Sequence, residues 1–378
     1  MNQKTLLAIY ERLESLLGKL PGPLQNAIKG ELRPIKQTFL TQRLARLVIV
    51  GQNSFDLSGL FSGLLGNDLQ MVDSQSSVGW VTYQMRGKGG FRILDARRLN
   101  DTSLSWKALS DAVAAESPDL FLFVVNENMP KELGLECEQT ARLLELAEQR
   151  HQSKAGLIGI FDGPERSPSA PSLELQAWLS AQPRLASHFV KALSVSSFVR
   201  FRVDGSIDPD RDERRNLDVL GELIVRELPE DAQIDMARLV DAKKVQTEIA
   251  GRLVRSITTI CAAIGAQPIP LADFPILTAL QAALVTGIMN ISGRELGIKT
   301  ATEFFGALGA NIGAGMILRE AARAGVKFLP GWGNAISGGI AAAGTYAIGR
   351  SAVAYFVEGL SLAEARKIFR RRKLQKRE

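Results

Sequence analysis

Short apolar runs alternate with stretches of helical spacing between Leu47 and about Leu228. Six of the runs have the length of a strand: Leu47–Val50, Trp80–Gln84, Phe91–Leu94, Leu120–Val125, Leu157–Phe161 and Ala192–Val195. The glycine-rich stretch Arg86–Gly90 predicts a hairpin between the second and third runs. Continuously apolar runs are typical of parallel strands that are covered on both faces. The pattern therefore predicts an α/β domain over residues 44–228, with a mostly parallel sheet between helices.

The rest of the chain has a helical pattern. Residues 1–43 predict an N-terminal helical segment that is broken near Pro21, and residues 229–365 predict an all-α domain. Two stretches of that domain carry no charge, Phe274–Gly293 with 20 residues and Phe328–Gly349 with 22. Each matches the ~20 residues that cross a bilayer. Both are rich in small residues, which favour close helix packing in membranes and in soluble bundles alike, so a compact bundle and a membrane-inserting hairpin both fit.

The positive charge is concentrated at one end of the chain. The formal net charge is +6, and residues 366–378 contain eight Lys or Arg and one Glu, so the tail carries +7 and the remainder −1. A solvated charge run and a segment attracted to anionic lipid both fit this composition. Nucleic acid is a weaker alternative, because Phe369 is the only aromatic residue of the tail. Two cysteines, Cys137 and Cys261, exclude a disulfide framework and indicate a reducing compartment.

The stretch Leu47–Gly66 is similar to a phosphate-binding loop that has lost essential residues. A P-loop needs Gly-x-x-x-x-Gly-Lys-Ser/Thr, because backbone N–H groups surround the phosphates, the lysine binds them and the hydroxyl binds Mg²⁺. Gly51 and Ser58 keep the outer spacing. The second glycine is replaced by Asp56 and the lysine by Leu57, so a carboxylate stands where phosphate oxygens should be received.

Further nucleotide motifs are expected after the later strands of a Ras-like, P-loop NTPase-type fold, whose layout is six strands with one hairpin. After the third run, Asp95 stands where Asp-x-x-Gly begins, with Arg98 in place of the glycine. After the fifth run, the base-reading motif ends in Glu165 instead of aspartate. After the sixth run, Ser196 stands near the usual Ser-Ala. These positions occur in the order expected for a GTPase, but each one is altered or incomplete.

The chain resembles bacterial GTPase-like proteins that have an Era-like G domain followed by domain of unknown function 697. The stretches that carry the resemblance are Trp80–Tyr83, Ile93–Asp95, Pro268–Asp273, Glu303–Gly309, Arg319–Arg323, Pro330–Asn334 and Gly344–Gly349. The resemblance implies the Ras-like fold followed by a helical domain. Members have intact nucleotide motifs, so Leu57, Arg98 and Glu165 are departures that speak against GTPase activity.

The sequence thus predicts a non-catalytic pseudo-GTPase that binds a protein partner and associates with a membrane. The partner is expected to be an intact GTPase of the same family or a second copy, and the location the cytoplasmic face of a bacterial inner membrane, with the cytoplasm as alternative. No cofactor is expected. The vestigial nucleotide-site positions are Gly51, Ser58, Asp95, Glu165 and Ser196. The alternative is a weak GTPase that binds GTP, with Mg²⁺ on Ser58 and Asp95 and a borrowed arginine charge from Arg97 or Arg98.

Overall fold

The computed structural model describes residues 22–69, 79–85, 87–97, 106–126, 133–163, 170–266, 274–294, 298–308 and 332–374. The chain forms two compact units. Arg43–Ala242 make up the sheet unit, and Met1–Gln42 together with Lys243–Glu378 make up the helical unit.

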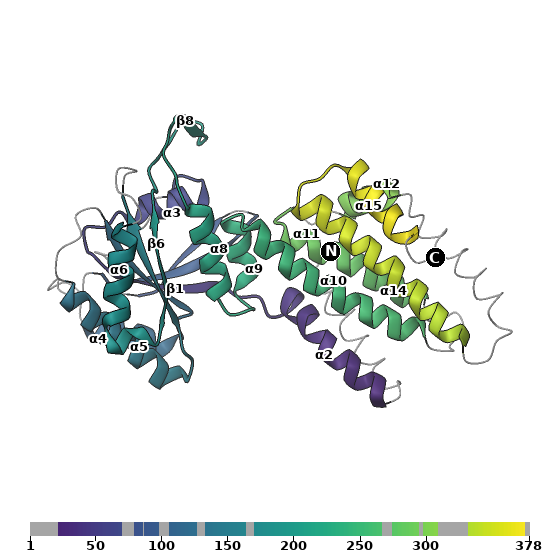
Figure 1. Ribbon diagram of the computed structural model, residues 1–378, viewed down its shortest axis with the longest axis horizontal. Coiled ribbons are helices and arrows are strands. Elements are labelled where there is room, and N and C mark those ends of the chain that lie inside the picture. Colours follow the sequence, from purple (N-terminus) through teal and green to yellow (C-terminus); the bar gives the residue numbers. More distant parts are fainter. Residues whose placement is uncertain are drawn as a thin grey trace. The chain divides into compact units, whose positions relative to one another are not determined.

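The sheet unit is built on one six-stranded sheet in the order β2-β3-β1-β4-β5-β6 (Figure 1). The strands are β1 Ala45–Gly51, β2 Val81–Met85, β3 Gly89–Asp95, β4 Leu120–Asn126, β5 Gly156–Asp162 and β6 Phe189–Val195. Strand β2 is antiparallel to β3, and all other neighbours are parallel. The six predicted strands and the hairpin are therefore confirmed, as is the α/β fold class with the arrangement of a Ras-like G domain.

Helices cover both faces of this sheet because side chains alternate between the faces along each strand. Val48 of β1 and Phe121 of β4 join a buried cluster with Leu109, Leu144 and Leu175, which lie on α4, α5 and α6. Helix α9 contacts β3 and β1, and α8 contacts both α9 and α3 on the other side of the sheet (Figure 1). The helices are α3 Leu57–Leu65, α4 Trp106–Ala115, α5 Gly134–His151, α6 Ala170–Ala181, α7 Pro183–Ala186, α8 Leu217–Glu227 and α9 Gln233–Leu239.

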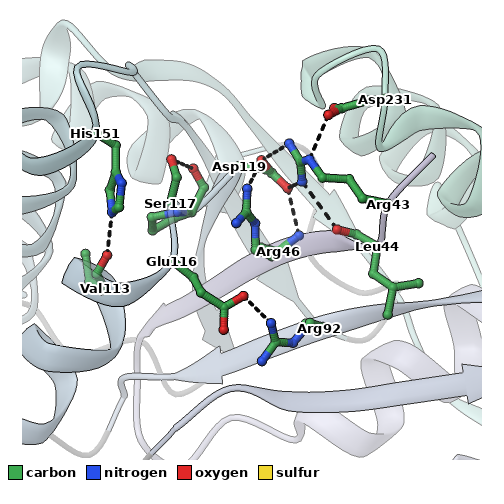
Figure 2. A network of polar contacts seen from close by, with 11 residues as sticks. Arg43, Leu44, Arg46, Arg92, Val113, Glu116, Ser117, Asp119, His151 and Asp231 are labelled. Carbon is green, nitrogen blue, oxygen red and sulfur yellow. Dashed lines mark hydrogen bonds and ion pairs between the residues drawn. The ribbon is translucent and has the colours of Figure 1, made fainter. Parts of the chain in front are cut away.

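A partly buried ion-pair network lies at the amino edge of the sheet, where β1 and β4 begin (Figure 2). The carboxylate of Asp119, 3% exposed, accepts two hydrogen bonds from the guanidinium of Arg43, at 2.7 and 2.8 Å. It also accepts the backbone N–H of Arg46 at 2.9 Å. The Arg43 Nε atom donates to Asp231 at 2.8 Å, which connects the start of β1 to the segment before α9. The pKa of Arg43 is raised, mainly because the Asp119 carboxylate stabilises its charge.

A second sheet, with two strands, follows β6 in the chain and projects from the sheet unit, where Figure 1 labels its second strand β8. It consists of β7 Val199–Phe201 and β8 Ile207–Asp212, which pair antiparallel. No strand was predicted here, because β8 is polar and its side chains are half-buried or exposed.

The helical unit is a bundle in which α10, α11 and α14 contact one another and α2 packs on α10. Its helices are α2 Gly22–Phe39, α10 Lys243–Gly265, α11 Phe274–Ile291, α12 Ile298–Ala307, α14 Trp332–Ala352, the π-helix η1 Val353–Val357 and α15 Leu362–Leu374. A Cβ at Gly349 would lie 2.7 Å from the Val254 side chain, so the small residue allows α14 to approach α10 closely. The unit is all-helical where it is described, as the sequence predicts, and α2 of the N-terminal segment belongs to it.

Two boundaries differ from those expected. Helix α9 packs on the sheet, so the sheet unit extends to Ala242 beyond residue 228. Residues 366–374 continue α15, which packs on α14, instead of forming a separate tail. Among the described residues, one helix, Gly339–Val357, is long and apolar enough to cross a membrane, and 56% of it is buried inside the protein. The other uncharged stretch, Phe274–Gly293, forms α11, in which only the shorter segment Leu280–Ile291 is classed as apolar.

Candidate functional site at the carboxyl edge of the sheet

The segment that corresponds to a P-loop connects β1 to α3. Gly51 ends β1 with φ +102°, and a Cβ there would lie 2.5 Å from the carbonyl oxygen of Val124 on β4. The next residue, Gln52, donates its N–H to the same carbonyl at 2.8 Å, and its side chain accepts the N–H of Asn126 at 2.9 Å. A glycine at position 51 is thus required by chain packing, whether or not a nucleotide is bound.

The N-terminus of α3 is capped by the chain itself. Asp56 is the N-cap residue, and its side chain accepts the N–H of Gly59 at 2.9 Å. A carboxylate at this place satisfies the helix N–H groups and the positive end of the helix dipole, which a P-loop offers to phosphate. Leu57, in the lysine position, is 7% exposed and belongs to the core. With Asp56 and Leu57 at these two positions, the segment forms a capped, packed helix start.

Asp95, in the position that holds Mg²⁺ in a GTPase, forms a bidentate ion pair with Arg97. The guanidinium donates to the two carboxylate oxygens at 2.9 and 2.7 Å. Its third nitrogen donates to the carbonyl of Phe55, so the pair also fixes the loop that precedes α3. Both side chains are largely buried, 13% exposed for Asp95 and 8% for Arg97. The carboxylate charge that would attract a cation is therefore compensated within the chain.

Asp162 ends β5 at the same edge and is held by Ser197. The Ser197 backbone N–H donates to Asp162 at 3.0 Å, and the Ser197 hydroxyl donates to the other carboxylate oxygen. Burial raises the pKa of Asp162, the two Ser197 hydrogen bonds oppose this shift, and the nearby carboxylate of Asp56 adds to it. Ser196 is 4% exposed and exchanges two backbone hydrogen bonds with Arg215, 3.1 and 3.0 Å long.

The structure brings most of the predicted positions to one edge of the sheet. Gly51, Asp95 and Ser196 follow or end strands β1, β3 and β6, and Ser58 lies in the first turn of α3. Glu165 lies outside the described residues. Sequence reasoning named Arg97 as a source of positive charge for GTP, whereas its guanidinium binds Asp95. It missed the contact between Ser197 and Asp162, which nothing in the local pattern signals.

No group of three or more metal-ligating His, Cys, Asp or Glu side chains occurs among the residues that the structure describes. Four polar side chains at the carboxyl edge, Asp56, Asp95, Arg97 and Asp162, make intramolecular hydrogen bonds. The arrangement is chemically suited to stabilising the loop and the helix start.

A scan against protein-family models finds no match to this chain, and no curated protein matches it. Solved structures with a similar fold include LeoA, a bacterial dynamin GTPase from ETEC, at 13% identity and a TM-score of 0.36. That match covers 87% of this chain, which spans 60% of LeoA.

Toc33 from Arabidopsis thaliana, a dimerization-deficient mutant, matches 58% of this chain and 94% of its own, at 11% identity and a TM-score of 0.33. A third structure is an oligomerised bacterial dynamin pair that is described as sensing and tethering membranes. That match covers 98% of this chain and 72% of the other chain, at 8% identity and a TM-score of 0.35. Similarity at this level says nothing about the activity, ligand or partner of this chain.

Proposed function

We propose that the sheet unit is a GTPase-like domain without GTPase activity, and that it serves as a protein-interaction module. The observation that carries the proposal is the cap of α3 by Asp56, whose carboxylate takes the place that phosphate needs. Phosphoryl transfer depends mainly on positioning and on electrostatic stabilisation of the phosphate charge. A site with a carboxylate at the helix start and Leu57 for lysine supplies neither.

A retained fold with an altered nucleotide site supports a role in binding. The proposed partner is an intact GTPase of the same kind or a second copy of this chain. The domain of unknown function 697 remains part of the proposal for the helical unit. We further propose that the chain associates with the cytoplasmic face of a bacterial inner membrane, on the motive of the apolar helix Gly339–Val357 and the basic C-terminal segment.

Calorimetry of the full chain with GTP and GDP at millimolar Mg²⁺ tests the absence of nucleotide binding. We expect no heat of binding, because the Asp56 carboxylate occupies the helix start and Leu57 replaces the lysine that would bind phosphate. Micromolar binding that is lost in Ser58→Ala or Asp95→Ala would instead establish the weak-GTPase alternative. Lys154→Ala, at an exposed residue just before the amino end of β5, is the matched control.

The proposed partner is tested separately by sedimentation of the pure chain, alone and with a GTPase that has intact motifs. Self-association or formation of a complex of defined stoichiometry is expected. A monodisperse monomer that binds no such GTPase would contradict the interaction role and leave the nucleotide result unaffected.

A further inference from the structure

The C-terminal helix α15 presents one strongly basic face. Arg366, Lys367, Arg370 and Arg371 are all exposed, whereas Ala365 and Phe369 are buried. At 3.6 residues per turn the four basic residues fall within about 140° of the helix circumference, opposite the buried pair. We call these four residues the basic arc.

The helix that carries the arc is well defined at its start. Ser361 and Glu364 form a capping box, because the Ser361 N–H donates to the Glu364 carboxylate at 2.9 Å and the Glu364 N–H donates to the Ser361 hydroxyl at 3.3 Å. Since α15 also packs on α14, the arc is held on a rigid element. The hydrogen bonds of Ser361 lower the pKa of Glu364, so this acidic neighbour of the arc stays ionised and occupied at the helix start.

We infer that the basic arc is the surface through which this chain docks on an anionic lipid bilayer, an inference that rests on the proposed membrane association. Four cations on one side of a helix complement a plane of lipid phosphates, and each basic residue near such a surface adds attraction. Four more basic residues follow in the sequence, Arg372, Lys373, Lys376 and Arg377.

The chemistry of the arc favours lipid headgroups over nucleic acid and over helix insertion. Single-strand binding uses aromatic side chains as stacking platforms, and the one aromatic residue in the described part of α15, Phe369, is 9% exposed. Insertion of an amphipathic helix needs an apolar face directed to the lipid, but the apolar residues Ala365 and Phe369 face the protein. The arc therefore contacts the bilayer at the level of its headgroups.

The test is co-sedimentation of the full chain with vesicles of phosphatidylglycerol and phosphatidylcholine, and with vesicles of phosphatidylcholine alone. The arc variant combines Arg366→Gln, Lys367→Gln, Arg370→Gln and Arg371→Gln. The matched control removes the same charge from exposed lysines of the sheet unit: Lys88→Gln, Lys107→Gln, Lys154→Gln and Lys191→Gln. All eight side chains are exposed, so circular dichroism should confirm that both variants fold.

We expect binding to the anionic vesicles only. Each neutralised residue should weaken binding about 5-fold, so the arc variant should lose several-hundred-fold while the control stays near wild type. Binding should fall between about 0.1 M salt, where the Debye length is ~10 Å, and about 1 M, where it is ~3 Å.

Three results would overturn the inference, and they separate it from the broader proposal. An arc variant that binds like wild type places the contact elsewhere and leaves membrane association standing. Salt-resistant binding that only detergent reverses means insertion. If the wild-type chain does not bind anionic vesicles, or binds duplex DNA more tightly at the same salt, the result contradicts the proposed membrane association as well as the role of the arc. None of these results bears on nucleotide binding.

Discussion

The two edges of the sheet hold similar sets of charged residues. At the amino edge, Arg43 binds the buried carboxylate of Asp119 through its two terminal guanidinium nitrogens. At the carboxyl edge, Arg97 also binds Asp95 with two hydrogen bonds, but through Nε and one terminal nitrogen. The first edge is where a G domain has only structural contacts, and the second is where it has its ligand. Both edges of this sheet therefore hold an arginine–carboxylate ion pair whose charges are compensated within the chain.

The largest effect is expected for Asp119→Ala at the amino edge. Removal of this carboxylate, 3% exposed, takes away an ion-pair partner from Arg43 and Arg46. Because Arg43 keeps Asp231 and both arginines are partly exposed, we expect a loss of about 3 kcal/mol, the lower end of the range for a broken buried pair. Urea unfolding followed by tryptophan fluorescence measures it, since three of the four tryptophans, Trp80, Trp106 and Trp178, lie in the sheet unit. Asp208→Ala, which breaks the exposed pair with Arg202, is the control and should cost about 0.5 kcal/mol. Equal effects of the two variants would contradict the structural role of the network.

The second prediction places the carboxyl edge on the same scale. Arg97→Ala should lower the free energy of unfolding by about 2 kcal/mol, because Asp95 remains largely buried and loses its counter-charge. Arg97→Lys should recover only part of this loss, because an ammonium group cannot reproduce the bidentate contact. Unfolding in urea with and without Mg²⁺ is the measurement. An Arg97→Ala variant with unchanged stability, or one that Mg²⁺ stabilises, would show that the two edges differ and that Asp95 retains a metal site.

The third prediction concerns the helix cap. Asp56→Ala removes the acceptor for the Gly59 N–H and should cost about 1 kcal/mol, reduced by the relief of repulsion with Asp162. Asp56→Asn keeps a capping oxygen and serves as the control, for which a smaller loss is expected. Thermal unfolding of the two variants and of wild type is the measurement. If Asp56→Ala left the stability unchanged, or gained micromolar affinity for inorganic phosphate, the carboxylate would not act as a stabilising cap. It would instead block a site that can bind anions.

The elements that the sequence predicts are those whose apolar pattern is strong. The six strands follow from continuous apolar runs, and the all-α character of the second unit follows from its helical pattern. The uncharged stretches fitted a compact bundle and a membrane-inserting hairpin alike. The hairpin β7–β8 escaped prediction because its β8 residues are polar and half-buried or exposed, so tertiary position and not periodicity makes it a strand. The start of helix α15 can be predicted in principle, because Ser361 and Glu364 have the spacing of a capping box. The run of basic residues that follows favours a solvated tail instead, so the composition conceals the helix.

The candidate site shows the same division. The spacing of Gly51 and Ser58 and the place of Asp95 predict where the site lies, because the carboxyl ends of parallel strands share one edge. The ion pair between Asp95 and Arg97 depends on the backbone conformation of the residues that connect them. The apolar pattern of the sequence does not predict that conformation. The cap by Asp56 is readable as an aspartate directly before an apolar helix.

The smallest expected effect, and the finest test of the carboxyl edge, is the pH dependence that Asp162 contributes. Burial raises the pKa of this carboxyl above its usual value of 3.8, so its contribution to stability is fully present below pH 3.8 and is lost as the pH rises through the raised pKa. The stability of wild type relative to Asp162→Asn, measured by urea unfolding, should therefore fall as the pH rises from about 4 through the raised pKa of Asp162. Asp204→Asn is the control of opposite sign, because Ser206 lowers the pKa of Asp204 and the stability of wild type relative to that variant should rise with pH. Ser197→Ala removes the hydrogen bond from the hydroxyl to Asp162, which lowers the pKa of that carboxyl, and should therefore extend the Asp162 effect to higher pH. A difference between wild type and Asp162→Asn that does not change with pH would mean that the Asp162 carboxylate is open to water, unlike the buried carboxylate of Asp119 at the amino edge.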